Sequence, residues 1–409
     1  MKFWVDRREE LKDSKAPGRT HALVIGTSLY RWLPKGDAAP PDPERKTLGL
    51  SQVDISATSA LLFANWLRDH FQNPDAPLAT IMLFITPSDN EIANVAGMKD
   101  VAADFIGTTR GKIMGALTEW SKLCRGNPAG VAVLYASGHG IQIPGSKEDA
   151  FILLEDFADD PMIFNYSIDV GSNRRAMVGP DMPQNQLYFA DACRLPPNTP
   201  LLGLGTGAAL PYDPSVPDKR SAPIYYSALS NTKALGVIRK GTFFMQALIE
   251  CLNSLALSGP NKKSAIPLER DKWHVSVPEL LSPLDQRVKE LAIAKSQELA
   301  ARGINVDFPD QGVTMGGEAR AAVFHALSDA PKVKLTLEVD PDSMAANAKA
   351  ALWAGKQQIG ENRDCRPKPC EFGEVDAGLY SLDIIVDGKK VAGAVVQADP
   401  PQTVFPYQL

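Results

Sequence analysis

The sequence predicts an α/β protein with a mostly parallel central sheet, followed by a small all-β sandwich module. Between residues 20 and 300, short apolar segments alternate with amphipathic helical segments. This alternation is typical of a sheet that helices cover on both faces. From about residue 330, apolar residues recur at every second position instead, which is typical of strands with one buried face.

The strands of the parallel sheet are predicted from five short apolar runs. Each run is continuous and is rich in aliphatic or aromatic residues, as expected of strands buried on both faces. They cover residues 21–26, 79–85, 130–135, 186–190 and 224–227. Functional groups of such sheets gather at the carboxyl ends of the strands, so the residues that follow these runs are the candidates for a site.

Amphipathic helices are predicted over residues 55–70, 109–124 and 243–255, where apolar residues recur at spacings of three and four. Cys124 and Cys251 fall on the apolar faces of the second and third of these helices. We therefore interpret both as inert core thiols.

Two long connections interrupt the α/β pattern. Residues 155–178 are acidic and polar, and residues 194–222 are rich in proline and glycine. Connections of this length without regular structure are usually functional or mobile. The predicted organisation is an N-terminal extension (1–20), an α/β domain (21–328) and a β-module (329–409).

The β-module is predicted from period-two segments at residues 332–339, 379–386 and 390–396. Asp387-Gly388 lies between the last two segments and is a hairpin signal. No group in this module is an evident catalytic residue, so we expect a docking or stabilising role.

Composition restricts the classes of function. The chain has 409 residues, of which 44% are hydrophobic and 22% charged, with a net charge of −5. These proportions are those of a globular protein, and the acidity argues against a nucleic-acid partner. No apolar run approaches the ~18 residues of a membrane helix, and charges near the start argue against a signal peptide. We expect a cytoplasmic protein with no membrane partner.

The number and spacing of the cysteines argue against structural disulfides and a zinc site. Five cysteines in 409 residues are too few for a disulfide scaffold. Cys365 and Cys370 flank a short segment, but a zinc site would need two further ligands, and the nearest histidine in sequence is the distant His325. We expect no metal there.

Two motifs end neighbouring strands of the predicted sheet. Ser137-Gly138-His139-Gly140 follows the third strand, and Asp191-Ala192-Cys193 follows the fourth. A nucleophilic cysteine needs a base or an imidazolium partner, because a thiol with a pKa near 8.5 is mostly protonated at neutral pH. Glycines let backbone N–H groups approach a developing oxyanion. The pattern predicts a Cys–His nucleophilic site.

These motifs resemble those of the caspase-like clan of cysteine proteases (peptidase C14 type), and metacaspases and prokaryotic caspases more than animal caspases. Metacaspases typically show Tyr-Ser-Gly-His-Gly and Asp-x-Cys, which His139 and Cys193 match. Residues 22–26 and 241–248 are also similar to family segments, so the resemblance covers about residues 20–300. It implies a caspase-like three-layer fold. The chain departs from the family at Arg194-Leu195-Pro196, where metacaspases have His-Ser-Gly, and at Thr27, where Asn is usual.

The resemblance implies a role for each motif residue. Cys193 would be the nucleophile and His139 the general acid and base, with the oxyanion held by the backbone N–H groups of Cys193 and Gly140. Asp191 would place a carboxylate in the S1 pocket, where it would favour cleavage after Arg, with Lys second. The same pocket would be lined by Asp54, Ser137 and Ser227. Protein substrates with exposed Arg or Lys are the implied partners.

Activation by cleavage is also implied, because enzymes of this clan are often held inactive until a loop after the nucleophile is cut. Lys219-Arg220 in the 194–222 connection, which we expect to be exposed, and Arg174-Arg175 in the other connection match the predicted specificity. Self-cleavage or an upstream protease would make the chain a zymogen. Bacterial members of the clan often serve antiviral, CRISPR-linked or cell-death defence.

Two alternatives stay open. Some metacaspases depend on calcium held by clustered acids, and Asp156, Asp159 and Asp160 are a weak counterpart; otherwise no cofactor is expected. The chain could instead be a catalytically silent caspase-like scaffold for protein–protein docking. The departure at Arg194-Leu195-Pro196 favours this second reading, whereas the presence of both motif residues disfavours it.

Overall fold

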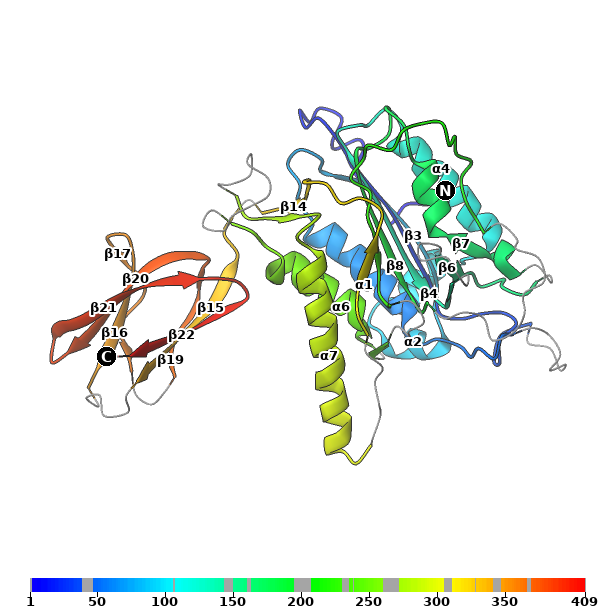
Figure 1. The fold of residues 1–409 in the computed structure, drawn as a ribbon. Helices are drawn as coiled ribbons and strands as arrows, with labels where there is room; N and C mark the ends of the chain where they lie inside the picture. Colours follow the sequence, from blue (N-terminus) through cyan, green and yellow to red (C-terminus); the bar gives the residue numbers. More distant parts are fainter. Residues whose placement is uncertain are drawn as a thin grey trace. The chain divides into compact units, whose positions relative to one another are not determined.

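The fold is taken from a computed structural model that describes residues 2–38, 47–105, 107–142, 150–159, 163–194, 207–229, 235–237, 239–259, 272–304, 311–327, 329–340, 347–365 and 369–408. The chain divides into two compact units, drawn in Figure 1. The first unit comprises residues 1–251 and 276–325, and the second comprises residues 252–275 and 326–409.

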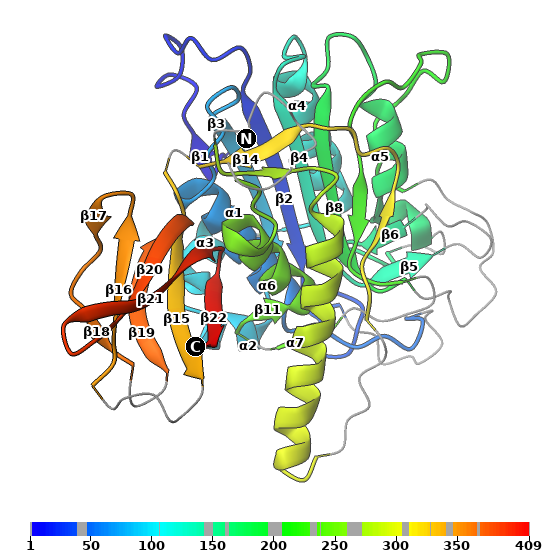
Figure 2. The same cartoon turned by 60° about the vertical axis from the view of Figure 1, so that its left-hand side comes forward.

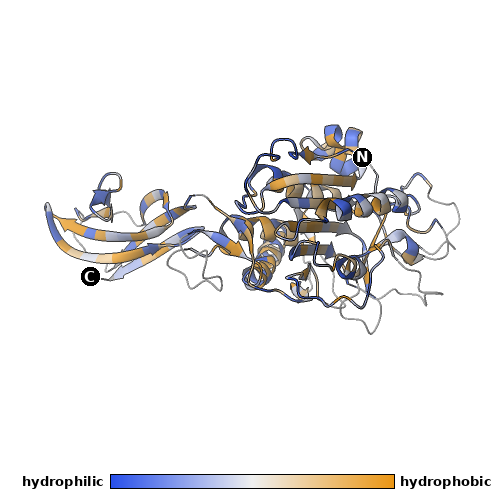
Figure 3. Cartoon of the chain, turned by 90° about the horizontal axis from the view of Figure 1, so that it is seen from above, coloured by the Kyte–Doolittle hydropathy of each residue, from blue (hydrophilic) through white to orange (hydrophobic). Residues whose placement is uncertain are grey.

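The first unit is built on a seven-stranded sheet of order β1-β3-β2-β4-β8-β9-β13. The five inner strands are parallel, and β1 and β13 pair antiparallel at the two edges. The five predicted strands are therefore confirmed. The sheet comprises β1 (Val5–Asp6), β2 (Thr20–Thr27), β3 (Leu78–Thr86), β4 (Val131–Gly138), β8 (Asn185–Ala192), β9 (Ile224–Tyr226) and β13 (Thr314–Gly316). Its inner strands are mostly hydrophobic (Figure 3).

Helices cover both faces of this sheet, which gives the three layers (Figure 2). On one face, Phe63 of α1 packs against Tyr135 of β4 and Phe189 of β8. On the other face, Trp120 of α4 meets Tyr188 of β8. The first face carries α1 (Ser56–Asp69) and α6 (Phe243–Glu250), and the second carries α4 (Arg110–Cys124) and α5 (Val170–Ala176). The alternation of strand side chains thus places odd-numbered residues of β8, including Asp191, on the α1 side.

One long helix lies outside the predicted set. α7 (Leu281–Ala301) packs on α6, where Arg287 Nε lies 2.5 Å from Glu250 Oε2. The first unit is completed by α2 (Asp89–Asn94), α3 (Met98–Phe105), β5 (Gly140–Gln142), β6 (Ala150–Leu153), a 3-10 helix (Ile163–Tyr166), β7 (Ser167–Asp169), β10 (Gly236–Val237) and β11 (Gly241–Thr242). A π-helix (Cys251–Leu255), β12 (His274–Ser276) and β14 (Val323–Ala326) lie where the chain passes between the units.

The expectation that residues 155–178 lack regular structure is wrong. This segment contains the 3-10 helix, β7 and α5. Ile168, Val170 and Met177 of the segment are buried in the core beneath α4. Asp169 then caps α5, because its Oδ1 accepts the backbone N–H of Ser172 at 2.8 Å.

The second unit contains the predicted β-module as two sheets, of order β19-β15-β22 and β17-β16-β20-β21, with β18 also paired to β16. Asp387 and Gly388, with φ of 48° and 74°, make the two-residue turn between β20 and β21, which confirms the predicted hairpin. The strands are β15 (Lys332–Asp340), β16 (Lys349–Ala354), β17 (Gln357–Gln358), β18 (Arg363–Asp364), β19 (Cys370–Asp376), β20 (Gly378–Val386), β21 (Lys389–Ala398) and β22 (Gln402–Gln408).

Within the described part of the chain, every helix is too short or too polar to cross a lipid bilayer.

Candidate active site

The register of β4 and β8 brings the two motifs together. Ser137 pairs with Asp191 and Gly138 with Ala192, so His139 and Cys193 each follow directly at the carboxyl edge. A Cβ added to Gly140 would lie 2.1 Å from the Cys193 carbonyl oxygen and 2.7 Å from Ala192 Cβ. A side chain at position 140 would therefore clash with the end of β8, and glycine allows the two strand ends to approach.

His139 is oriented by two neighbouring segments. Its Nε2 lies 2.7 Å from the carbonyl oxygen of Ser51, and its backbone N–H donates to Tyr30 Oη at 2.7 Å. The Tyr30 ring packs against the imidazole with centroids 5.1 Å apart. A carbonyl oxygen can only accept, so Nε2 carries the proton. In the neutral ring, Nδ1 is therefore the nitrogen with the lone pair that can take a proton.

Burial lowers the pKa of His139, and the hydrogen bond to Ser51 opposes this shift only in part. The imidazole is consequently neutral around pH 7 and can act as a base.

Cys193 differs from the other four cysteines in exposure. It is half-buried, whereas the others are buried, and none of the five is in a disulfide. Burial raises the pKa of Cys124, and it raises that of Cys251 to about 12. Both are therefore unreactive thiols at neutral pH. Cys193 is the most exposed of the five thiols.

Asp191 is a buried carboxylate, 1% exposed, at the end of β8. Its Oδ2 accepts hydrogen bonds from Tyr135 Oη at 2.6 Å and from Thr242 Oγ1 at 2.5 Å. Its Oδ1 and the neighbouring Ser137 Oγ are buried, and neither has a hydrogen-bond partner within the described part of the chain. Burial raises the pKa of Asp191 to about 6, and its hydrogen bonds from Thr242, Tyr135 and Ser227 oppose the shift. The site thus has acceptor capacity for a buried donor, and a cation satisfies it best.

The remaining pocket residues of the prediction divide into two places. Ser227 is buried beside the end of β8, where its Oγ lies 3.4 Å from the Ala192 carbonyl oxygen. Asp54 is half-buried and lines a cavity of about 470 Å³ together with Ser51 and Gln52. Because the lining of this cavity does not include Asp191, the structure brings Ser137 and Ser227 to Asp191 but gives Asp54 different neighbours.

Sequence reasoning missed Thr242 as a site residue. Its Oγ1 accepts the backbone N–H of Met245 at 3.1 Å, which caps α6, and it also donates to Asp191. A threonine that directly precedes an apolar helical run is an N-cap signal. That signal could have located the helix start, but not its contact with Asp191.

Arg194, which departs from the family pattern, is buried next to Cys193. Its guanidinium carbon lies 4.2 Å from the centroid of the Tyr226 ring, and its Nη1 donates to Thr314 Oγ1 at 3.0 Å. The side chain thus links the end of β8 to β9 and β13. Leu195 and Pro196 lie outside the described residues.

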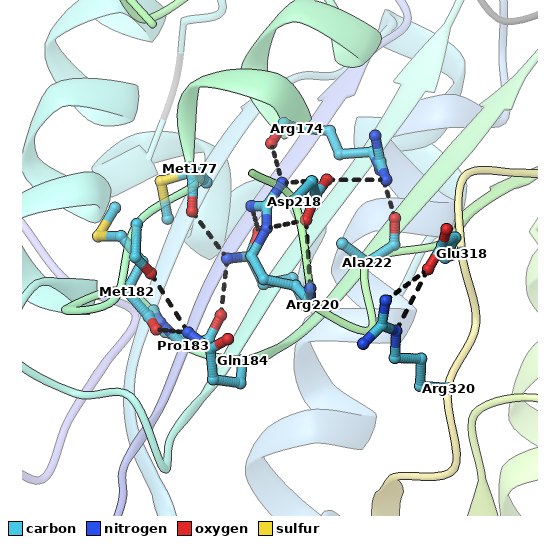
Figure 4. A network of polar contacts seen from close by, with 12 residues as sticks. Arg174, Met177, Met182, Pro183, Gln184, Asp218, Arg220, Ala222, Glu318 and Arg320 are labelled. Carbon is cyan, nitrogen blue, oxygen red and sulfur yellow. Dashed lines mark hydrogen bonds and ion pairs between the residues drawn. The ribbon is translucent and has the colours of Figure 1, made fainter. Parts of the chain in front are cut away.

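The expected exposure of Arg220 as a processing site is wrong. Arg220 is 2% exposed. Its guanidinium pairs with Asp218 and donates to the Arg174 carbonyl oxygen at 3.0 Å (Figure 4), and it also donates to Gln186 Oε1 at 2.8 Å. A buried arginine must satisfy its donors internally, and these partners do so. The preceding Lys219 is exposed as expected.

The second pair of candidate processing residues lies in a helix. Arg174 and Arg175 belong to α5 and are half-buried, and Arg174 Nε donates to the Ala222 carbonyl oxygen at 2.5 Å (Figure 4). Because β-pairing to a protease needs extended backbone, cleavage at these residues would require α5 to unfold.

The acids proposed for calcium have other roles. The Asp156 carboxylate accepts the backbone N–H of Arg110 at 2.8 Å at the start of α4, and Asp159 accepts the indole N–H of Trp32. Asp160 lies outside the described residues. Over the ranges that the structure describes, no three His, Cys, Asp or Glu side chains form a group that could hold a metal ion.

A family model and a solved structure match this chain. The model of the caspase domain, of the C14 peptidases, matches residues 19–302. Among solved structures, the chain is similar to caspase-1 from Spodoptera frugiperda with 11% identity and a TM-score of 0.42, covering 76% of this chain and 94% of that one. A search of curated proteins found no match.

Proposed function

Because this chain belongs to the caspase-domain family of cysteine peptidases, we propose that Cys193 and His139 are its catalytic dyad. The observation that carries this proposal is the placement of both residues at adjacent strand ends, with His139 Nε2 held by the Ser51 carbonyl oxygen. In this tautomer Nδ1 has the free lone pair, so it is the nitrogen that can accept a proton.

The proposed reaction follows from these groups. Nδ1 of His139 takes the proton of the Cys193 thiol, and the sulfur attacks the carbonyl carbon of the scissile bond. The electrons of the C=O bond move to the oxygen, which then accepts hydrogen bonds from the backbone N–H groups of Cys193 and Gly140. His139 then protonates the leaving amine, so a thioester remains on Cys193. A water, deprotonated by His139, attacks the thioester carbonyl carbon. The C–S bond breaks, the proton returns from His139 to the Cys193 sulfur, and the new carboxylate leaves.

We propose cleavage after Arg, with Lys second, because Asp191 supplies a buried carboxylate. Oδ1 of Asp191 and Ser137 Oγ are the acceptors that a substrate guanidinium would satisfy. Ser227 would complete this pocket, whereas Asp54 would act as a second acid from its cavity next to Ser51. Since Asp191 is 1% exposed, a substrate side chain reaches it only after a rearrangement.

We propose that activation supplies this rearrangement and that the chain is a zymogen. Cleavage after the exposed Lys219, by the enzyme itself or by an upstream protease, would separate Arg220 from the rest of the 194–222 connection. Lys219→Gln should remain uncleaved and stay less active than the processed wild type, whereas Lys122→Gln, an exposed lysine on α4, serves as the control. Equal activity of the uncleaved Lys219→Gln variant would refute this proposal.

The biological setting that we propose rests on the resemblance to metacaspases and prokaryotic caspases. It is a cytoplasmic peptidase of bacterial antiviral, CRISPR-linked or cell-death defence, which acts on proteins that expose Arg or Lys. It would need no resident cofactor. Mapping the new N-termini that appear in bacterial cells when wild-type protein, but not Cys193→Ala, is expressed would test it.

The experiment for the peptidase itself compares matched fluorogenic peptides with Arg, Lys or Asp at P1. It uses intact protein, protein nicked in the 194–222 connection, and the variants Cys193→Ala and His139→Ala. We expect Arg to be the best substrate and both variants to be inactive. A preference for Asp would refute the role of Asp191, and silence of intact and nicked protein, with and without calcium, would favour the docking scaffold.

A further inference from the structure

The side-chain amide of Gln52, the residue after Ser51, links the segment that supplies the Ser51 carbonyl to the backbone around Tyr30. Gln52 Oε1 accepts the backbone N–H of Tyr30 at 2.7 Å, and Gln52 Nε2 donates to the Tyr30 carbonyl oxygen at 2.8 Å and the Leu33 carbonyl oxygen at 3.4 Å. The donor and acceptor types of these backbone groups fix which way the amide points.

These contacts replace a strand partner for Tyr30. The strand β2 ends at Thr27, so the backbone of Tyr30 lies beyond the ladder of the sheet. Buried backbone N–H and C=O groups need partners, and the Gln52 amide pairs with both groups of the same residue.

Tyr30 is in turn tied to the histidine. Its side chain is fully buried, its Oη accepts the backbone N–H of His139, and its ring packs on the imidazole. A Cβ added to Gly138 would lie 2.8 Å from Tyr30 Oη, so the end of β4 also fits closely around this phenol.

The contacts form one closed circuit. From His139, one path leads through Tyr30 to the Gln52 amide, and the other leads through the Ser51 carbonyl to the Gln52 backbone. Both groups that orient the imidazole are therefore held in mutual position by Gln52.

We propose that Gln52 is a positioning residue, which keeps the Ser51 carbonyl against His139 Nε2 and so fixes the Nε2–H tautomer and the orientation of the ring. This inference rests on the catalytic role proposed for His139. Without the amide, Ser51 and Tyr30 lose the direct link between them, and the imidazole samples orientations in which Nδ1 is not presented for proton transfer. Misplacement of a catalytic group by about 1 Å can cost on the order of 100-fold in rate.

The fold does not depend on this amide alone. The backbone N–H of Val53 donates to the Ser28 carbonyl oxygen at 3.0 Å, so the segment remains docked. Gln52 is half-buried and lines the cavity of about 470 Å³. Its truncation therefore enlarges an existing cavity rather than opening the core.

The test uses two variants of the full chain and a matched control. Gln52→Ala removes the amide, and Gln52→Glu keeps an acceptor for the Tyr30 N–H but loses the donor to the Tyr30 carbonyl. The control, Gln184→Ala, removes an amide that bonds the Gly179 and Met182 carbonyl oxygens at 3.2 and 2.8 Å near the amino end of β8 (Figure 4). Peptidase kinetics, thermal unfolding and the ¹⁵N chemical shifts of the His139 ring are measured for each.

We expect both Gln52 variants to lose about 10- to 100-fold in kcat, with KM within about two-fold, and to convert the His139 signal from the Nε2–H form to a tautomer mixture. Gln184→Ala should match the wild type in all three respects. If the Gln52 variants keep the wild-type kcat and the wild-type tautomer of His139, the role of Gln52 is refuted, but the proposed function is not. Loss of the folded state in both variants would also overturn the inference, since Gln52 would then be a structural residue. Full activity of His139→Ala would instead refute the proposed function, and the inference with it.

Discussion

Replacing Asp191 by Asn is expected to make the protein more stable at neutral pH and less active on Arg substrates. Asn has the shape of Asp, and its oxygen can still accept from Tyr135 and Thr242. It carries no charge, however, so the cost of burying a carboxylate disappears. Active sites commonly contain residues that lower the stability of the fold but are needed for activity.

The magnitude follows from the pKa of Asp191, which burial raises from 3.8 to about 6. A raised carboxyl pKa means that the protonated form favours folding. This contribution is fully present below pH 3.8 and is lost as the pH rises through 6. A shift of about two pKa units corresponds to about 3 kcal/mol at one pKa unit per ~1.4 kcal/mol. We compare the free energy of unfolding of Asp191→Asn with that of wild type. The difference in favour of the variant should be about 2–3 kcal/mol larger at pH 7.5 than at pH 4.

The assay is urea unfolding of both proteins from pH 4 to 7.5, followed by peptide kinetics. Asp156→Asn is the control, because burial also raises the pKa of Asp156 to about 6, but that residue caps α4. Only Asp191→Asn should lower kcat/KM for Arg peptides, by about 10- to 100-fold for a lost charged hydrogen bond. A stability difference that does not change with pH would refute the reasoning on burial. Unchanged Arg cleavage would refute the pocket.

Three further predictions follow from the contacts at the site. Gly140→Ala should lower kcat/KM by about 100-fold, because the added Cβ would lie 2.1 Å from the Cys193 carbonyl oxygen and misplacement of a catalytic group by an ångström has an effect of this size. The control is Gly111→Ala, at a helical glycine with open space around it, which should match wild type. Iodoacetamide should modify Cys193 before the four buried thiols, as peptide mass mapping would show, and equal labelling of Cys124 would contradict the assignment. Arg220→Met should lower the free energy of unfolding by about 2 kcal/mol at pH 7.5, since it removes the charged hydrogen bonds that the guanidinium donates to Asp218 and Gln186. Denaturant unfolding with an unchanged midpoint would exclude this role.

Local pattern was sufficient for the elements of the sheet. The central strands are continuous apolar runs because helices cover both of their faces, and the hairpin at Asp387-Gly388 is encoded by two residues that accept positive φ. The pairing of His139 with Cys193 could be inferred because parallel neighbours end at the same edge. The helix α7 and the structured part of residues 155–178 were not predicted, because their burial depends on partners far away in sequence.

The sequence by itself determined the class of fold, which depends on short-range periodicity. It also placed His139 and Cys193 after neighbouring strands, while the role of Asp191 was implied by the family resemblance. Only the tertiary structure decided how these groups are supported. Gln52 and Tyr30 lie 87 and 109 residues from His139, and Thr242 lies 51 residues from Asp191. No local sequence signal connects these residues. Tertiary structure also decided that Arg220 is buried while Lys219 is exposed, because burial of a charge depends on whether Asp218, Gln186 and Arg174 converge on it.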